Sequence, residues 1–327
     1  MTDPPPALGT QLEAVLDRGN FLAAFAKVAE NGGCRGADGV TIGEFRESLL
    51  EELDFLEASV RRRVYLPFPL LHVEVPKRSG IGTRALDIPT VRDRVLQTAV
   101  DRVVRPIFEA EFEPSSFAYR GGLSVASAVA RVAELRDQGF RFVVDADVDA
   151  CFDSIPHPEL LARLRRLPID PPILHLFERW VRAETWDGSR LTSLERGIPQ
   201  GSTVSPLLAN LFLDRLDERL AAERFEAVRY ADDFVVLCRA SEEADRALHL
   251  TEEILSELKL VLDEEKTRVT SFEQGFRFLG ATFLGDGICR PWATEHREPS
   301  QVVLPPPLDL ATYIALRAEG TAWRFSI

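Results

Sequence analysis

The stretch "AVRYADDFVVLC", residues 227–238, places two adjacent aspartates inside a mainly apolar run. Neighbouring carboxylates repel each other, and burying either one without a partner is costly. The run predicts two strands joined at Asp232 and Asp233, in a β-hairpin. Aspartate is also favoured at turns because it hydrogen-bonds the local backbone, so the pair alone is weak evidence for a site.

A second acidic stretch, "FRFVVDADVDACFDSIPH" (140–157), begins as a β-branched strand and ends near Pro156. Because side chains alternate along a strand, Asp145, Asp147 and Asp149 would share one face. If the hairpin turn lies beside this strand, three or more carboxylates converge and require cations. Clustered oxygen ligands suit Mg²⁺, and two such ions about 3.5–4 Å apart are the usual arrangement for in-line phosphoryl transfer.

The composition fits a globular protein with two or three domains or lobes: 327 residues, 45% hydrophobic and 28% charged. We find no run of about 18 uncharged apolar residues, which predicts that no segment crosses a membrane. The N-terminal stretch shows no secretory signal, which points to the cytoplasm. The four cysteines are widely spaced, which predicts buried reduced thiols rather than a zinc site or disulfides.

The net charge of −13 excludes a protein that is basic all over. It does not exclude nucleic-acid binding, because the local field decides that. Residues 61–105 carry ten Lys/Arg and four acids, a local charge of +6. This region is either a phosphate-facing surface or a set of solvated helix faces.

The periodicity predicts α+β structure. We expect a strand–turn–strand unit over 70–89, turning at 77–84, and closing strands within 264–272 and 275–284. Residues 192–223 are expected to run from a strand through a Gly/Pro loop into a long helix. Other expected helices lie at 12–30, 43–63 (capped by Thr41), 90–109 (Thr90), 124–139 (Ser124), 158–167, 171–183 and 241–260. Without a βαβ repeat, this order favours an antiparallel sheet backed by helices.

Seven motifs in this order resemble the reverse transcriptases of the group II intron type, over roughly residues 36–284. "RYADDFVVLC" is similar to the catalytic hairpin motif, and "VVDADVDACFDSIPH" to the first aspartate motif, whose Asp-x-x-x-x-Phe-Asp form selects Asp147. "RGIPQGSTVSPLLANLFLD" resembles the most specific block of the family. "KRSGIGTRALDIPTVRDRVLQ" and "FAYRGGLSVASAV" resemble the upstream finger motifs, and "LDEEKTRV" and "FRFLGATF" the lysine motif and the primer-contacting hairpin.

The resemblance implies an RNA-directed DNA polymerase that adds dNTPs to the 3′-hydroxyl of a DNA or RNA primer on an RNA template. Asp147 and Asp232 would ligate two Mg²⁺ ions, with Mn²⁺ as the alternative. The carbonyl of Val148 would complete the metal site together with catalytic Asp233, the second carboxylate of the pair, which often sits further from the metals. Lys266 would protonate the leaving pyrophosphate.

The resemblance also implies substrate contacts. Lys77 and Arg84 flank the "SGIG" turn and would clamp the triphosphate. Phe152 would exclude a ribose 2′-hydroxyl, although its ring could equally be core packing. Gln200 and Gly201 would contact the template or the incoming nucleotide. The template and primer contacts would be made by Tyr119, Arg120, Phe278, Leu279 and Gly280.

The implied architecture is a right-hand polymerase fold, α+β, whose thumb is absent or rudimentary. Residues 1–11 would be a flexible N-terminus, and the fingers would comprise 12–118 with 158–202. The palm would comprise 119–157 and 203–283. Residues 284–327, with "LPPPLDL" inside them, would be a C-terminal extension or linker, or the start of a missing thumb.

The motif wording and the missing maturase region also resemble CRISPR-associated reverse transcriptases, which work with an integrase complex to acquire spacers from RNA. Two alternatives stay open: a maturase-like RNA-binding subunit with a vestigial site, and a defence-related relative with non-templated or protein-primed synthesis. An RNA-directed RNA polymerase is disfavoured by Phe152.

Overall fold

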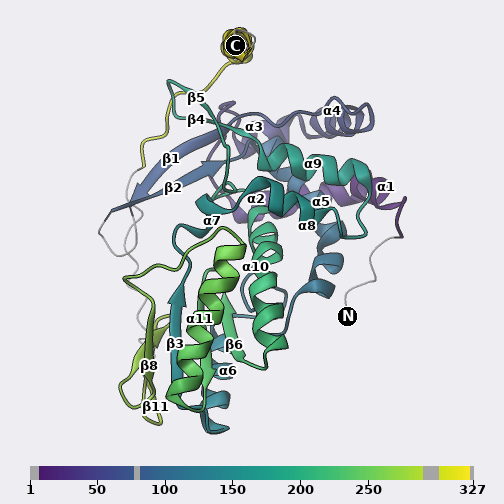
Figure 1. Ribbon diagram of the computed structural model, residues 1–327. Helices are drawn as coiled ribbons and strands as arrows, with labels where there is room; N and C mark the ends of the chain where they lie inside the picture. Colours follow the sequence, from purple (N-terminus) through teal and green to yellow (C-terminus); the bar gives the residue numbers. More distant parts are fainter. Residues whose placement is uncertain (1–6, 77–81, 290–301, 325–327) are drawn as a thin grey trace.

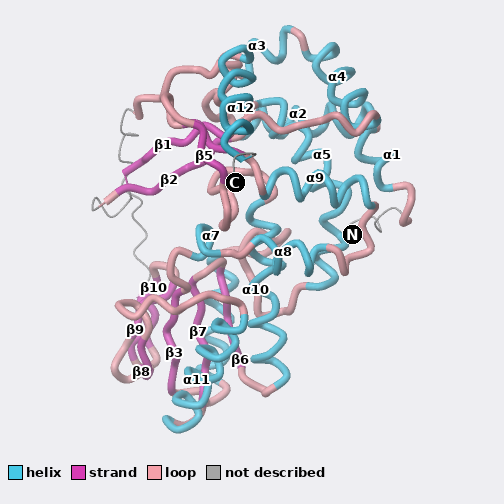
Figure 2. The backbone as a smooth tube through the Cα atoms, turned by 45° about the horizontal axis from the view of Figure 1, so that its top comes forward, coloured by secondary structure: helices cyan, strands magenta, loops and turns pink. Residues whose placement is uncertain are grey.

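The structure, a computed structural model, describes residues 7–76, 82–289 and 302–324. Figures 1 and 2 show the two larger sheets in separate parts of the molecule, each with its own helices. The expectation of an α+β fold with an antiparallel sheet is confirmed.

The sheet that contains the opening stretch, here called the central sheet, has the strand order β6-β7-β3-β8. All its pairs are antiparallel, and its strands are β3 (Phe142–Asp147), β6 (Glu226–Tyr230), β7 (Asp233–Cys238) and β8 (Arg268–Ser271). A small second sheet of β9 (Phe276–Phe278), β10 (Ala281–Leu284) and β11 (Gly287–Cys289) follows it along the chain.

Both faces of the central sheet are buried, which explains why β7 is apolar along its length. Phe234 and Val236 belong to one hydrophobic core, and Val235 and Leu237 to another, because successive side chains leave opposite faces. Helices α10 (Ser205–Ala222) and α11 (Ser241–Glu257) pack on the first face, and α6 (Val125–Asp137) on the second.

The other large sheet, here called the hairpin sheet, has the order β2-β1-β4-β5. Its strands are β1 (Leu70–Pro76), β2 (Thr83–Ile88), β4 (Glu184–Trp186) and β5 (Leu191–Ser193). β1 and β2 form the expected antiparallel hairpin, and β4 joins β1 in parallel. Lys77 lies outside the described residues.

The remaining helices fall into two groups. Beside the hairpin sheet lie α1 (Gln11–Leu16), α2 (Arg18–Asn31), α3 (Ile42–Glu47), α4 (Leu49–Arg61), α5 (Val91–Glu111) and α9 (Pro171–Val181) (Figure 1). The short helices α7 (Cys151–Ser154) and α8 (His157–Leu164) lie between this group and α10 (Figure 1).

The C-terminal segment contains a helix that the sequence analysis did not predict. Residues 302–309 are extended, and α12 (Leu310–Arg324) follows them next to the hairpin sheet (Figures 1 and 2). Leu308 packs into the small hydrophobic core of that sheet. Local capping explains the helix start, because the carboxylate of Asp309 accepts a hydrogen bond from the amide of Thr312 over 2.9 Å.

Local capping explains where other helices begin. Thr41, Thr90 and Ser124 each accept a hydrogen bond from the third backbone amide of their helix, as the sequence predicts. Two expected continuous helices are instead broken. Asp17, at ψ 134°, separates α1 from α2 and caps α2, and Ser48, at φ −108°, separates α3 from α4.

The structure bears on two further predictions, that the cysteines are buried reduced thiols and that no segment crosses a membrane. All four cysteines are free; Cys151 and Cys238 are buried, but Cys34 is half-buried and Cys289 is exposed, so the expectation of buried thiols holds for two of them. Among the described residues, no helix combines the length and apolar character needed to span a membrane.

Candidate active site

The paired aspartates meet the upstream aspartate at one end of the central sheet. Asp147 ends β3 and lies directly opposite Asp233, the first residue of β7. The amide of Val148 donates a hydrogen bond to the carbonyl oxygen of Asp232 over 3.3 Å. Ala231, at φ 61°, makes the left-handed turn between β6 and β7. Acids more than eighty residues apart in sequence therefore share one edge.

This edge carries more negative charge than its surroundings neutralise. Burial raises the pKa of Asp147, and the charge of Asp232 adds to the effect. Burial raises the pKa of Asp233 to about 7, reinforced by Asp147, Asp145 and Asp232. Each carboxylate thus makes ionisation of the next one harder, which is the electrostatic signature of a site that a cation stabilises.

One protein cation already lies at this edge. The Nζ of Lys266 forms an ion pair with Asp147 and a second, at 3.0 Å, with Asp263. Both acids raise the pKa of Lys266 well above its ordinary value, so its ammonium keeps its proton near the reacting edge. Asp145 lies further along β3 and is engaged by Arg268 at 3.1 Å.

A buried arginine that our sequence interpretation missed supports the turn. Arg229, on β6, is 1% exposed. Its guanidinium donates to the carboxylate of Asp217 on α10 at 3.0 Å and to Asn210 at 3.0 Å. It also donates to the carbonyl of Ala231 at 3.0 Å, directly before Asp232. The sequence signal was an arginine in an apolar strand and an aspartate in the apolar face of the long helix.

Two predicted substrate residues face this edge from other elements. Tyr119 follows a segment that pairs with β6 and is 46% exposed, with φ 62°. Burial raises the pKa of its phenol, the charge of Asp232 adds to this, and Arg84 opposes it. Tyr119 therefore lies within electrostatic reach of both Asp232 and the exposed Arg84 on β2.

The "PQG" motif connects β2 of the hairpin sheet to α7. The carbonyl of Gln200 accepts a hydrogen bond from the amide of Asp87 on β2 over 2.6 Å, and its side-chain amide donates to Asp153 over 3.2 Å. Gly201 has φ +122°, and a Cβ there would lie 3.0 Å from the carbonyl oxygen of Asp87. Only glycine permits this backbone approach without strain.

The remaining predicted residues have different positions. Phe152 lies on α7 after the aspartate motif and is half-buried against the main core. Arg120 is held by Glu109 at 2.8 Å and by the carbonyl of Glu113 at 2.8 Å, which places it beneath the surface that Tyr119 presents.

The predicted primer hairpin is the β9–β10 turn. Phe278 is 1% exposed and packs in the core, so its ring is structural. Leu279 and Gly280 form the turn itself, with φ 50° and 80°. Leu279 is half-buried and Gly280 is exposed, and the role of the three residues stays a prediction.

The basic region of residues 61–105 makes several contacts within the protein, and Arg61 and Arg102 are exposed all the same. Five of its arginines donate hydrogen bonds to protein groups: Arg61, Arg92, Arg94, Arg102 and Arg105. Their charges serve helix packing, which favours the interpretation as helix faces for these five. Arg84 is exposed, and its charge opposes the rise in the pKa of the Tyr119 phenol.

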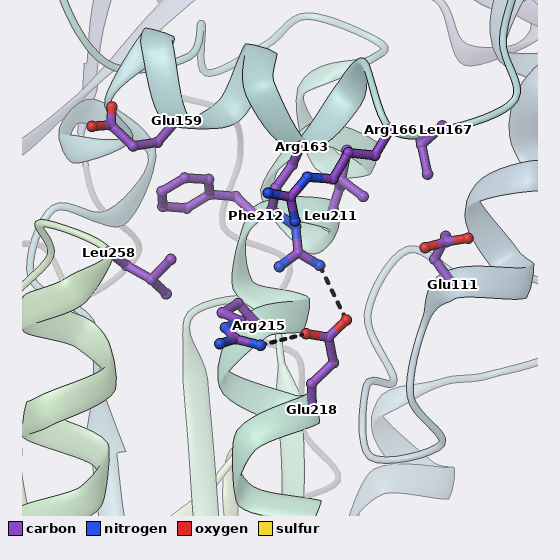
Figure 3. Close-up of a pocket in the computed structure, with 10 residues that line it drawn as sticks. All are labelled: Glu111, Glu159, Arg163, Arg166, Leu167, Leu211, Phe212, Arg215, Glu218 and Leu258. Carbon is purple, nitrogen blue, oxygen red and sulfur yellow. Dashed lines mark hydrogen bonds and ion pairs between the residues drawn. The ribbon is translucent and has the colours of Figure 1, made fainter. Parts of the chain in front are cut away.

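The pocket in Figure 3, about 360 Å³, lies elsewhere, between α8 and α10. Arg163 and Arg215 both point to Glu218, which pairs with them at 3.5 and 3.4 Å. The charged residues that line the pocket neutralise each other. Among the described residues, no predicted site residue lines this pocket.

The donors at the carboxylate edge suit Mg²⁺. Within the described chain, no three His, Cys, Asp or Glu side chains form a preassembled metal cage. Mg²⁺ does not need one, because it commonly uses one or two carboxylates together with waters and substrate phosphates. Asp147, Asp232 and the backbone of Val148 supply that smaller set.

Comparison with known proteins gives a consistent result. The family model described as "Reverse transcriptase (RNA-dependent DNA polymerase)" matches residues 75–283. Protein YkfC of Escherichia coli K12 is 30% identical over 286 residues, which cover 75% of this chain and 74% of YkfC. The group II intron-encoded protein LtrA of Lactococcus lactis is 27% identical over 298 residues, which cover 70% of this chain and 49% of LtrA. The chain therefore spans about half of LtrA.

Among solved structures, a chain of a partial Cas6-RT-Cas1–Cas2 complex is 28% identical. The match covers 76% of this chain and 41% of that one, with a TM-score of 0.47. A superposition this loose says nothing about assembly.

Proposed function

The chain belongs to the reverse transcriptase (RNA-dependent DNA polymerase) family, and from this premise we propose that it extends a primer 3′-hydroxyl with deoxynucleotides on an RNA template. One observation supports the proposal above all: Asp147 lies opposite Asp233, and Val148 bonds the backbone of Asp232. This brings the acids of two separate motifs to one edge, where phosphoryl-transfer chemistry needs them.

Two Mg²⁺ ions, or Mn²⁺ in their place, are the proposed cofactors. Asp147 and Asp232 would hold them, with the Val148 carbonyl as a further ligand and Asp233 behind. When bound, they supply charge stabilisation of the attacking and leaving oxygens. The raised pKa of Asp233, about 7, supports a need for positive charge at this edge.

The chain's own residues would position and protonate the substrate. Lys266 keeps its proton next to Asp147 and would deliver it to the departing pyrophosphate. Arg84 would bind the triphosphate together with Lys77, which lies outside the described residues. Gln200 and Gly201 would contact the template or the incoming nucleotide. Phe152 would exclude the ribose 2′-hydroxyl.

The domain assignment follows from these roles. We propose that the central sheet and its helices are the palm, comprising 119–157 and 203–283, and that 12–118 with 158–202 are the fingers. Tyr119, Arg120 and the turn at Leu279 and Gly280 would line the path of template and primer.

The test is primer extension on poly-rA/oligo-dT with Mg²⁺ and dTTP, comparing the wild type with Asp232→Asn. The substitution removes a charge but keeps the shape, so we expect extension to disappear while the melting temperature and template binding stay unchanged. Undiminished extension by Asp232→Asn would overturn the assignment.

Omitting the template or the primer separates templated synthesis from non-templated or protein-primed synthesis. Inactive wild-type protein would favour a vestigial site.

A finer proposal concerns the biological role. The residues of the two motifs "DADVDACFDSIPH" and "FAYRGGLSV" favour a role in spacer acquisition from RNA, together with a CRISPR integrase complex. Association with purified Cas1–Cas2, measured by sedimentation, is the expected result. A chain that sediments alone at micromolar concentrations of both would contradict this role.

A further inference from the structure

The C-terminal segment "VVLPPPL" (302–308) is bound to the hairpin sheet by specific hydrogen bonds. Arg35 donates to the carbonyl of Pro305 over 2.6 Å, and the indole nitrogen of Trp186 donates to that of Pro306 over 3.0 Å. Proline has no N–H, so its carbonyl is its only backbone hydrogen-bonding group. Leu308, the first residue after the prolines, donates its amide to Ala37 over 2.7 Å.

Two glycines allow the prolines to approach this closely. Gly188 has φ +99°, and a Cβ there would lie 2.8 Å from Cδ of Pro306 and 2.9 Å from Cβ of Pro305. Gly39 has φ +82°, and a Cβ there would lie 3.1 Å from the ring of Pro307. These contacts are with rigid rings, which cannot rotate aside as a long side chain would.

An apolar anchor completes the contact. Leu308 is 2% exposed and packs with Ala37, Leu71, Val73 and Trp186. This cluster is separate from the two larger cores of the molecule. Leu71 and Val73 belong to β1, so the tail supplies part of the hydrophobic core of that strand.

We propose that Arg35, Gly39, Trp186 and Gly188 form a polyproline-recognition site, and that prolines 305–307 are its resident ligand. Consecutive prolines favour the polyproline II conformation and lose little entropy on binding. Aromatic grooves with N–H donors are the usual means of recognising such segments, because the ligand offers carbonyls and ring faces but no N–H. The proposed site offers one aromatic ring, that of Trp186, and two side-chain N–H donors, Trp186 and Arg35, to the carbonyls of the prolines.

The site has a consequence for catalysis, which rests on the proposed function. β1 pairs with β2 along its whole length, and β2 carries Arg84 opposite Val75. A docked tail therefore stabilises the hairpin that presents Arg84 to the triphosphate. Loss of docking is expected to raise the KM for dNTP more than it lowers kcat.

Hydrogen exchange on the full chain tests the docking directly. Prolines 305–307 have no amides, and the first two positions of a peptide lose their label, so a peptic peptide over 303–308 reports mainly on Leu308. We expect the Leu308 amide to be protected, and to exchange about three- to tenfold faster in Trp186→Phe, which keeps the ring but loses one hydrogen bond. Gly188→Ala should have a similar or larger effect.

Gly32→Ala is the matched control, because Gly32 also has positive φ, +66°, but an added Cβ would meet no atom of the described structure within 4 Å. It introduces comparable backbone strain and should leave Leu308 protected. An unprotected Leu308 amide in the wild type, or equal effects of Gly188→Ala and Gly32→Ala, would overturn the proposal.

A peptide in trans tests recognition itself. The synthetic peptide VVLPPPLDL should bind the full chain in which the three prolines are replaced by serine, as measured by calorimetry. It should not bind the wild type, whose own segment is present at an effective concentration on the order of millimolar. No binding to the serine variant would refute a recognition site. If docking behaves as expected but no variant or wild type extends a primer, the proposed function fails and the recognition site stands.

Discussion

Replacing Arg229 by methionine should be among the most destabilising single changes in the chain. Arg229 and Asp217 are each 1% exposed, and the guanidinium also bonds Asn210 and the carbonyl of Ala231. Methionine fills similar space but leaves a buried carboxylate without its partner. Breaking such a pair costs about 3–5 kcal/mol, a large part of the about 5–15 kcal/mol that holds a typical domain folded.

Urea unfolding measures this cost. The control is Arg215→Met on the same helix as Asp217, because the side chain of Arg215 is 44% exposed and meets Glu218 at 3.4 Å. We expect that control to lose less than about 1 kcal/mol. The double variant Arg229→Met/Asp217→Leu should recover most of the loss, because it removes the unpaired charge. If Arg229→Met cost no more than the control, or if the double variant were worse than the single, the reasoning would fail.

The same residue should affect catalysis separately from stability. Arg229→Lys keeps the charge but has one nitrogen in place of a planar fork, so it cannot hold both Asp217 and the carbonyl of Ala231. A displacement of Asp232 by about 1 Å would lower the rate of primer extension on the order of a hundredfold. The assay is run where circular dichroism shows the variant folded. A wild-type rate there would show that the Ala231 contact does not position Asp232.

Three further predictions follow from single positions. Gly201→Ala should destabilise by about 1–3 kcal/mol in urea unfolding, because its φ of +122° and the nearby carbonyl of Asp87 leave no room for a Cβ; an effect as small as that of Gly32→Ala would contradict this. Phe152→Val should lower discrimination against ribonucleotides at least about tenfold in single-nucleotide extension, and unchanged discrimination would return Phe152 to core packing. Burial raises the pKa of Asp93 from 3.8 to about 6, so the folded state holds its proton more tightly and stability should fall by on the order of 3 kcal/mol as pH rises from about 4 to 6. Asp93→Asn should flatten that part of the stability profile, and an unchanged slope would place the titration elsewhere.

The sequence was sufficient wherever the physical rule is local. An apolar run interrupted by paired aspartates predicted the β6–β7 hairpin, and the turn chemistry placed the aspartates at its tip. The three predicted caps, Thr41, Thr90 and Ser124, all form, because a cap involves only its own first turn. The family pattern then selected Asp147, and the structure places it opposite Asp233.

The sequence was insufficient where two distant segments decide the outcome. Arg229 could not be assigned without knowing that α10 packs on β6 and brings Asp217 to it. The prolines at 305–307 indicated an extended tail, but their partners Arg35 and Trp186 lie far away in sequence. Arg120 is the type of residue that often contacts a template strand. In the structure it donates hydrogen bonds to Glu109 and to nearby backbone carbonyls. None of these pairings follows from periodicity.

The arrangement predicts that two groups of residues will act on different kinetic constants. Arg229, Lys266 and the acids lie in or beside the central sheet, where we propose that the bond is made, so changes there should lower kcat. Arg84 and the tail site belong to the hairpin sheet, which is joined to the loop before α10 by the hydrogen bond from the amide of Asp87 to the carbonyl of Gln200. Changes on the hairpin sheet alter how a triphosphate is held before reaction and should raise the KM for dNTP. A hairpin-sheet variant such as Gly188→Ala that lowered only kcat would show that the two sheets act as one rigid unit.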